Sequence, residues 1–314
     1  MHAVADTTYE GFPAVELSSA EDVSVTYAPG VGMVGCSLRH GGEELLAQRG
    51  GLARYRSAGS TFGIPLLHPW ANRLSGFSCD LAGRHVDLDA DSPLVRLDQN
   101  GLPIHGLVNA SPYWSVDGMA ADDRAARLSA TLDFAARPEY LALFPFPHEL
   151  RMDVDLARST LTVRTTLRPT GDAPVPVSFG YHPYLTLPGV PRADWVVELP
   201  VGRHLKLDRH SIPTGETEPA TEPRAPLADR DFDDGYTGLE APPVFTLEGG
   251  GRRIEVQFGD GYPFAQVYAP PEDALICFEP MTAPTNALVS RWALPMVEPG
   301  ASFSTEFALR VKRV

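Results

Sequence analysis

The chain has 314 residues, of which 43% are hydrophobic, and its 26 basic residues face 40 acidic ones, giving a formal net charge of −14. This length allows a large core in one or two domains. The acidic balance argues against general binding of nucleic acids or anionic membranes, because both need a basic surface. A small anionic ligand held by one local arginine is still compatible with it.

The N-terminal segment MHAVADTTYEGFPAVEL lacks the basic and apolar regions of a secretory signal. No apolar run approaches the roughly 18 residues of a membrane helix. Cys36, Cys79 and Cys277 have no CxxC spacing, so the sequence predicts neither a disulfide framework nor a thiolate zinc site. We therefore expect a soluble cytoplasmic protein whose cysteines are small buried residues.

Alternation of apolar and polar residues is the main local pattern along the chain. Glycine (28 residues) and proline (30 residues) are frequent, which favours many short strands over long helices. Period-two alternation is typical of antiparallel strands with one buried and one solvated face. It occurs in the segments 23–27, 128–134, 152–156, 161–167, 254–258 and 303–309.

The connecting segments complete the predicted fold. DLARSTLTV (155–163) predicts a hairpin, and NALVSRWAL (286–294) a short helix. The segment 209–226 is rich in Pro, Thr and Glu, and we expect a surface excursion there because similar strands lie on both sides of it. The chain is therefore predicted to be all-β, a large antiparallel β-sandwich that forms one domain over residues 1–314.

Four segments interrupt the alternation and carry unusual polar residues. They are FGIPLLHPWANRL (62–74), NGLPIHGLVNASPYW (100–114), FGYHPYL (179–185) and ALICFEPMTAPTNAL (274–288).

The last of these segments places a carboxylate among apolar residues. Alternation puts Leu275, Cys277 and Glu279 on one strand face, so the Glu279 side chain is expected to point as a core residue does. Pro280 is expected to end the strand ladder, because it has no N–H to donate. A carboxylate that points inward is costly unless it is paired or lines a cavity. We therefore predict that Glu279 lies at the edge of a pocket.

His182 has a similarly constrained position. Pro183 restricts it to an extended backbone, and Gly180 allows the chain to bend or to approach another segment closely. Taken singly, His182 and His105 are more often structural histidines, and Arg73 is more often a surface or salt-bridge residue. Only their combination points to a function.

That combination resembles a known family. The motifs PWANRL (69–74), IHGLV (104–108), FGYHPYL (179–185) and FEPMTAPTNAL (278–288) occur in this order and resemble the aldose 1-epimerase (galactose mutarotase) family. The resemblance covers roughly residues 60–290, and DFDDGYTGL (231–239) is similar to the family's aspartate-containing segment. It implies a large β-sandwich whose concave face holds a sugar. LLHPWANRL and IHGL lean towards the broader epimerase-like branch, which includes hexose-6-phosphate mutarotases.

The resemblance implies acid–base chemistry without a cofactor. Opening the sugar ring needs a proton taken from the C1 hydroxyl and a proton given to the ring oxygen, and two groups on opposite sides of the sugar suffice. Glu279 is the implied general base and His182 the implied general acid. The residue types fit, because a partly dry carboxylate has a raised pKa and an imidazole titrates near neutrality.

Further residues are implied to bind the sugar. His105 would donate a hydrogen bond to the ring oxygen or a neighbouring hydroxyl, and Arg73 and Asp233 would hold hydroxyls further round the ring. Asp234 is the alternative to Asp233, and Asn72 adjoins Arg73. Aromatic residues would supply a flat apolar surface on which the sugar stacks. His68, close to Asn72 and Arg73 in the sequence, is expected near the mouth of the site. The aromatic candidates are Trp70 and Tyr181, followed by Tyr184 and Tyr236.

Three other functions stay open at this point. A mutarotase of phosphorylated hexoses would need a basic cluster at the pocket rim, for which Arg54, Arg56 and Arg73 are candidates. A metal enzyme would use His105, His182 and Glu279 as a two-histidine, one-carboxylate site, although no close His-x-His spacing supports it. A non-catalytic sugar-binding module would keep the cleft without proton transfer. The sequence leaves the oligomeric state open.

Overall fold

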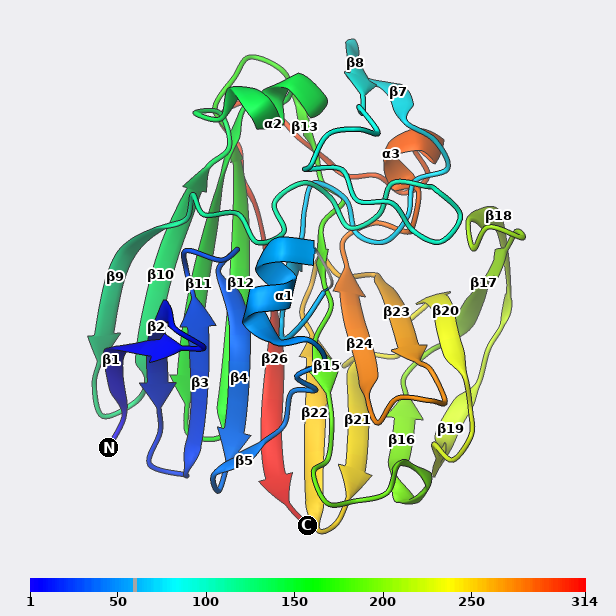
Figure 1. The fold of residues 1–314 in the computed structure, drawn as a ribbon. Coiled ribbons are helices and arrows are strands. Elements are labelled where there is room, and N and C mark those ends of the chain that lie inside the picture. Colours follow the sequence, from blue (N-terminus) through cyan, green and yellow to red (C-terminus); the bar gives the residue numbers. More distant parts are fainter. Residues whose placement is uncertain (59–60) are drawn as a thin grey trace.

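The computed structural model describes residues 1–58 and 61–314, and antiparallel strands dominate it (Figure 1). Within these residues the largest sheet has nine strands, in the order β19-β16-β21-β22-β26-β12-β11-β10-β9. Their bounds are β9 (Ser115–Ala121), β10 (Ala126–Asp133), β11 (His148–Ala157), β12 (Thr160–Pro169), β16 (Val196–Leu199), β19 (Glu222–Pro226), β21 (Val244–Gly249), β22 (Arg252–Phe258) and β26 (Phe303–Arg313).

A second sheet among the described residues has eight strands. Its order is β18-β17-β20-β23-β24-β14-β6, with β15 also paired to β24. Their bounds are β6 (Leu66–Leu67), β14 (Gly180–Tyr181), β15 (Tyr184–Leu185), β17 (Arg203–Leu207), β18 (Pro213–Pro219), β20 (Phe232–Thr237), β23 (Phe264–Ala269) and β24 (Ile276–Met281).

The remaining elements are smaller. An N-terminal sheet joins β1 (Ala3–Tyr9), β2 (Phe12–Ser18), β3 (Val23–Ala28), β4 (Val34–His40) and β5 (Glu43–Glu44). Two-stranded sheets pair β7 (Ser78–Leu81) with β8 (Arg84–Asp87) and β13 (Val175–Pro176) with β25 (Met296–Val297). The helices are α1 (Gly51–Ala58), α2 (Pro138–Leu143), α3 (Ala287–Ser290) and one 3₁₀ turn, Arg192–Asp194.

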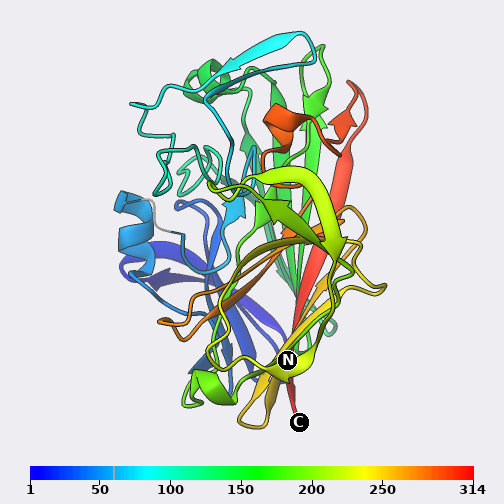
Figure 2. The same cartoon turned by 90° about the vertical axis from the view of Figure 1, so that its right-hand side faces the viewer.

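The main core lies between the sheets, as the alternation predicts. In β10 the side chains of Leu128, Ala130 and Leu132 are buried and the intervening ones are half-buried. The same alternation runs through β11, β12 and β26. Figure 2 shows the N-terminal sheet and β26 on different sides of the molecule, and one apolar cluster includes residues of both. The prediction of an antiparallel β-sandwich is therefore confirmed.

The finer predictions have mixed outcomes. The hairpin is confirmed, because Ala157 pairs with Thr160 between β11 and β12, and the short helix is α3. Residues 209–226 are mostly exposed, but they form β18 and β19, which are edge strands of the two large sheets. Prolines suit such edges because they remove hydrogen-bond donors that would recruit another strand.

The prediction that Pro280 ends its strand is wrong. β24 continues to Met281, which pairs with Phe264 on one side and Gly180 on the other. On the second side, the next ladder partner is Tyr184 opposite Cys277. The ladder is therefore interrupted between Cys277 and Met281, and a residue without an N–H is tolerated there.

Long connections gather at one end of the sheets. The segment between β6 and β9 runs there together with the β7–β8 hairpin, α2 and α3 (Figure 1). In the described residues, no helix is both long and apolar enough to cross a bilayer.

Candidate active site

Three neighbouring strands of the eight-stranded sheet carry the first group of site residues. Across β20, β23 and β24, Asp233 pairs with Tyr268, and Gln266 pairs with Glu279. These side chains share a face because residues opposite each other in a ladder point the same way. The pairing register therefore brings two carboxylates, 46 positions apart in the sequence, to the same face of the two strands that flank β23.

β24 is buried on both faces, which explains the position of Glu279. Ile276 and Phe278 enter the main core, whereas Leu275 and Cys277 belong to a separate small cluster with Tyr184. Glu279 lies on the second face and is 1% exposed. As predicted, it shares its face with Leu275 and Cys277 and borders a cavity, but this face looks away from the main core.

His182 enters the same region from the other side of β24. It lies at the break between β14 and β15, where its N–H donates to the Pro65 carbonyl. Gly180 makes this approach possible: a Cβ there would lie 2.6 Å from the Pro280 carbonyl oxygen. The His182 Nε2 atom consequently lies 3.2 Å from Glu279 Oε1.

Two loops, one carrying Asn72 and the other His105, form a further wall of the site. His105 donates its backbone N–H to the Asn72 carbonyl, and both residues have left-handed φ values of 65° and 55°. Such conformations are unfavourable outside glycine and are often found at functional sites. Gly106 makes the contact possible, since a Cβ there would lie 2.1 Å from the His68 carbonyl oxygen.

These segments enclose a cavity of about 180 Å³. Its described lining includes the residues predicted as catalytic and most of those predicted to bind the sugar: Asn72, Arg73, His105, His182, Asp233 and Glu279. Asp234 does not line the cavity. Its Oδ1 atom lies 2.9 Å from His204 Nε2. Of the two aspartates left open by the sequence, the structure places Asp233 in the cavity.

Trp70 and Tyr181 were wrongly predicted to line the site. Trp70 is fully buried in the main core. Tyr181 precedes His182 in an extended segment, so its side chain points to the opposite face, where its ring lies 4.8 Å from that of Phe307. Its hydroxyl is 2.5 Å from Thr165 Oγ1. Tyr236 is also buried in the core.

His68 was wrongly expected near the mouth of the site. It is fully buried, and its Nε2 atom lies 2.8 Å from His148 Nε2. Its backbone carbonyl accepts hydrogen bonds from Leu107 and Val108. His68 therefore supports the His105 loop from below and does not reach the cavity.

Several residues that the sequence patterns did not single out as sugar-binding also line the cavity. Arg49, Thr61, Ile104 and Tyr268 line the cavity, as does Tyr184, which was considered only as an aromatic wall. Tyr268 could have been found from a correct strand register, because it lies opposite Asp233. The Arg49 guanidinium carbon lies 5.1 Å from the Tyr184 ring centre, and no motif marks it.

The three arginines considered for a phosphate site do not gather at this cavity. Arg73 lines this cavity, Arg56 lines a larger neighbouring groove, and Arg54 lines neither. Arg73 is moreover paired twice, with Asp98 at 2.9 Å and with Asp233 at 3.3 Å. In the described part of the chain, no three His, Cys, Asp or Glu side chains are placed to share a metal ion.

Burial shifts the pKa values of Glu279 and His182 in opposite directions. It raises the pKa of Glu279 well above its ordinary value, with Asp233 raising it further and Arg73 opposing. It lowers the pKa of His182 well below its ordinary value, and His105 and Arg49 add to this lowering. Both effects favour the neutral forms. With one proton between the two groups, burial therefore favours the form that has a neutral Glu279 carboxyl beside a neutral His182.

The other polar groups hold this pair in place. Tyr184 stacks on His182 with ring centres 4.3 Å apart, and its hydroxyl lies 3.2 Å from His182 Nε2. The same hydroxyl contacts Thr61 Oγ1. Burial, with Arg96 and Arg73 nearby, lowers the pKa of His105 to about 3. His105 is therefore a neutral hydrogen-bonding group at physiological pH.

Asp233 is fixed by its own partners. Gln266 Nε2 donates to its Oδ1 atom at 2.8 Å, and Arg73 Nη2 lies 3.3 Å from its Oδ2 atom. The cavity thus combines one adjacent acid–base pair with fixed donors and acceptors on the surrounding walls. Such an arrangement can hold a small polyhydroxyl molecule and exchange two protons with it.

Comparisons with known proteins identify the family and the fold. Residues 32–310 match the family model described as Aldose 1-epimerase. No curated protein matches the sequence. Among solved structures, the Slr1438 protein of Synechocystis sp. PCC 6803 is 24% identical, with a TM-score of 0.79 and 96% of each chain covered.

Two further structures are similar in fold. A galactose mutarotase-like protein from Clostridium acetobutylicum is 17% identical, with a TM-score of 0.87 over 100% of this chain and 99% of that one. The galactose 1-epimerase from Lactobacillus acidophilus NCFM is 13% identical, with a TM-score of 0.79 over the same shares. At these identities the likeness concerns the fold.

Proposed function

Because this chain belongs to the aldose 1-epimerase family, we propose that it interconverts the α and β anomers of a neutral aldohexose by acid–base ring opening. The observation that carries this proposal is the 3.2 Å contact between His182 Nε2 and Glu279 Oε1 inside a small polar cavity. Proton transfer by positioned groups of this kind contributes roughly 10²–10⁴-fold to a rate.

The proposed reaction moves two protons. Glu279, as carboxylate, removes the proton of the C1 hydroxyl while His182, as imidazolium, protonates the ring oxygen and the C1–O bond to that oxygen breaks. The product is the open aldehyde beside a neutral carboxyl and a neutral imidazole. Rotation of the aldehyde and reversal of both transfers give the other anomer, so no proton is gained or lost overall.

The neutral pair of the free site is the protonation state that accompanies the open aldehyde. A cyclic sugar requires the ion-pair form, which arises when the proton crosses from Glu279 to His182. Arg73 lowers the pKa of both groups, so its charge favours release of the proton by Glu279 and disfavours its uptake by His182. The two groups already lie within hydrogen-bond reach, so the transfer needs no movement of the backbone.

The proposed geometry differs from the expectation that the two groups lie on opposite sides of the sugar. They are adjacent, at 3.2 Å. Adjacent groups suit the chemistry, because the C1 hydroxyl and the ring oxygen are bonded to the same carbon. In the proposed complex the C1 edge of the sugar faces the pair, and Asp233, Arg73 and His105 contact hydroxyls away from that edge.

A neutral sugar fits the charges of the cavity. Two cations, Arg49 and Arg73, line the cavity with Asp233, and Arg73 is also paired with Asp98. The His182–Glu279 pair carries no net charge, whether its proton lies on the carboxyl or on the imidazole. Polarimetry of freshly dissolved α-glucose, α-galactose and α-glucose 6-phosphate tests this directly. We expect acceleration of at least one neutral hexose above that of the phosphate. A protein that accelerates none of the three contradicts the proposed function.

The pH dependence follows from the coupled pair. The active form carries one proton shared by His182 and Glu279, and such pairs titrate together. Addition of a second proton stops catalysis at low pH, and the lowered pKa of His182 places this limb below the usual histidine value of 6.5. Loss of the shared proton stops it at high pH, and the raised pKa of Glu279 moves that limb upward.

We therefore expect a bell-shaped profile of kcat/KM once the spontaneous reaction is subtracted, with a plateau that includes neutral pH. Polarimetry at a series of pH values, from about 5 to 9, measures it. Because the two pKa shifts move both limbs outward, the series is extended below and above this range as far as the protein stays folded. An enzymatic rate that is flat over the whole extended series would argue against paired acid–base chemistry.

Substitution of Arg73 by alanine is expected chiefly to raise KM, by about tenfold, because a charge-assisted hydrogen bond to the sugar is lost. It also removes the cation that neutralises Asp98, whose side chain is fully buried. Asp98 then keeps the hydrogen bonds from the Asn100 and Leu102 N–H groups but loses its cation. Loss of one partner of a buried ion pair costs on the order of 3 kcal/mol, so the thermal midpoint should fall.

The variant Arg73→Ala/Asp98→Asn separates the two effects. It removes the unpaired charge, so the thermal midpoint should recover while KM stays high. Recovery of KM together with the midpoint would show that Arg73 acts only on stability.

A further inference from the structure

A second, larger depression adjoins the candidate active site. This groove has a volume of about 1240 Å³ and is bordered by α1, the loop after β8, the His105 loop and α2. Thr61, Ile104 and His105 line both the groove and the small cavity. The two spaces are therefore neighbours that share one wall.

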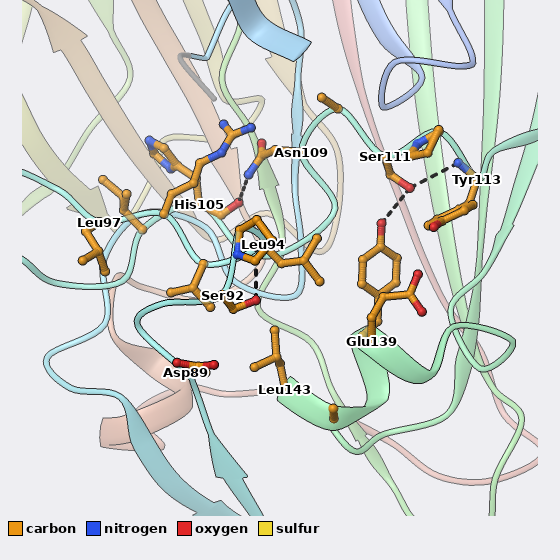
Figure 3. A pocket seen from close by; sticks show the side chains of 18 of the residues that line it. Asp89, Ser92, Leu94, Leu97, His105, Asn109, Ser111, Tyr113, Glu139 and Leu143 are labelled. Atoms are coloured by element: carbon orange, nitrogen blue, oxygen red, sulfur yellow. Dashed lines mark hydrogen bonds between the residues drawn. The ribbon is translucent and has the colours of Figure 1, made fainter. Parts of the chain in front are cut away.

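The arrangement of side chains gives the groove a direction. Figure 3 shows His105 and Leu97 on one side, Tyr113 and Glu139 on the other, and Leu94 with Ser92 between them. The groove thus leads from the wall of the small cavity towards α2. It is about seven times larger in volume than that cavity (1240 against 180 Å³), more room than one hexose uses.

The lining has the character of a site for neutral, hydroxyl-rich molecules. Its charges are nearly balanced, with two arginines (Arg56 and Arg96) against three carboxylates (Asp87, Asp89 and Glu139). Hydroxyl groups of serine and tyrosine alternate with apolar side chains such as those of Leu94 and Leu97. Pockets of this mixed kind hold ligands by apolar contact and orient them by a few polar groups.

One acceptor in this wall, the Asn109 Oδ1 atom, has no hydrogen-bond donor among the described residues. Asn109 donates from its Nδ2 atom to the His105 carbonyl oxygen at 2.6 Å. Its Oδ1 atom is buried. Buried acceptors are nearly always paired in native proteins. Because Asn109 lines the groove, a rotation of its side chain would present this acceptor to a sugar hydroxyl.

We propose that the groove is a saccharide-binding subsite, so that the preferred substrate is the reducing end of an oligosaccharide. This inference rests on the proposed function. The reducing-end hexose occupies the small cavity with its C1 hydroxyl free, as ring opening requires. The following sugar units are attached through a carbon away from C1, pass the His105 wall and lie in the groove.

The first test compares substrates on the unaltered protein. Anomer interconversion is measured by polarimetry or NMR for glucose, maltose, maltotriose and isomaltotriose. We expect kcat/KM for a trisaccharide to exceed that for glucose about tenfold, which corresponds to roughly 1.4 kcal/mol of added binding. The 4-linked and 6-linked sugars cover two routes from the cavity into the groove, and a gain with either supports the subsite.

The second test obstructs the groove. Ser92 is half-buried in the middle of the groove lining and does not line the small cavity. Ser92→Trp should abolish the gain for trisaccharides and leave the glucose rate within about twofold, since the bulk stays outside the cavity. Ser115→Trp is the matched control, because Ser115 is exposed on the edge strand β9; it should change neither rate.

Two results would overturn the subsite: equal kcat/KM for glucose and all three oligosaccharides on the unaltered protein, or equal loss for glucose and trisaccharides in folded Ser92→Trp. The substrate comparison decides even if that variant does not fold. Failure of the proposed function is distinguishable, because then glucose, galactose and the oligosaccharides would all react at the spontaneous rate.

Discussion

Glu279→Gln is expected to lower the enzymatic rate of anomer interconversion by roughly 10²–10⁴-fold. Glutamine keeps the shape of the side chain but cannot accept the proton of the C1 hydroxyl. The effect should appear in kcat, because the lost interaction is a proton transfer made in the transition state. Polarimetry under saturating sugar, with the spontaneous rate subtracted, measures it.

The fold should survive this substitution. Glu279 is 1% exposed and its Oε2 atom has no hydrogen-bond partner among the described residues. Because burial already favours the neutral carboxyl, an amide of the same shape removes no buried charge, and the thermal midpoint should stay close to that of the unaltered protein. Glu306→Gln, at an exposed ion pair with Arg164, is the matched control and should retain full activity. Turnover of Glu279→Gln near that of the unaltered protein would refute its role as the base.

His182→Asn is expected to cause a loss of the same order, again mainly in kcat. Asparagine cannot carry a proton to the ring oxygen, although it can still hydrogen-bond to Glu279. The acid limb of the pH profile should change as well, because His182 is the group assigned to it by its lowered pKa. The measurement is kcat/KM as a function of pH for both proteins.

The double variant Glu279→Gln/His182→Asn sharpens this prediction. Groups that act as a unit show strongly non-additive losses, so the double variant should be little slower than either single one. Multiplied losses would show that His182 and Glu279 act independently. Near-normal turnover of folded His182→Asn would remove it from the mechanism.

Local sequence patterns determined the fold class of this protein. Alternation with a period of two reports which side chains share a strand face, and this depends only on neighbouring residues. The strands at 128–134, 152–156 and 161–167 were therefore predictable, as was the hairpin in 155–163. The motifs also located most of the site, because unusual residues such as His182 before Pro183 interrupt that alternation.

Local patterns could not say which buried face is core and which is cavity. Tyr181 and His182 are adjacent in sequence and both buried, yet Tyr181 packs on Phe307 and His182 meets Glu279. Asp233 and Asp234 differ in the same way, and the pairing of β20 with β23 decides between them. A strand covered on both faces, such as β24, offers no sequence signal for the distinction.

The sequence by itself thus determined an antiparallel β-sandwich, the family and the residue types available for proton transfer. Only the tertiary structure decided that His182 and Glu279 are adjacent, that Arg49 and Tyr268 line the cavity, and that a groove continues beyond His105. The physical reason is that these features arise from contacts between segments far apart in the chain. Strand register, loop closure and burial set such contacts together, and no single segment encodes them.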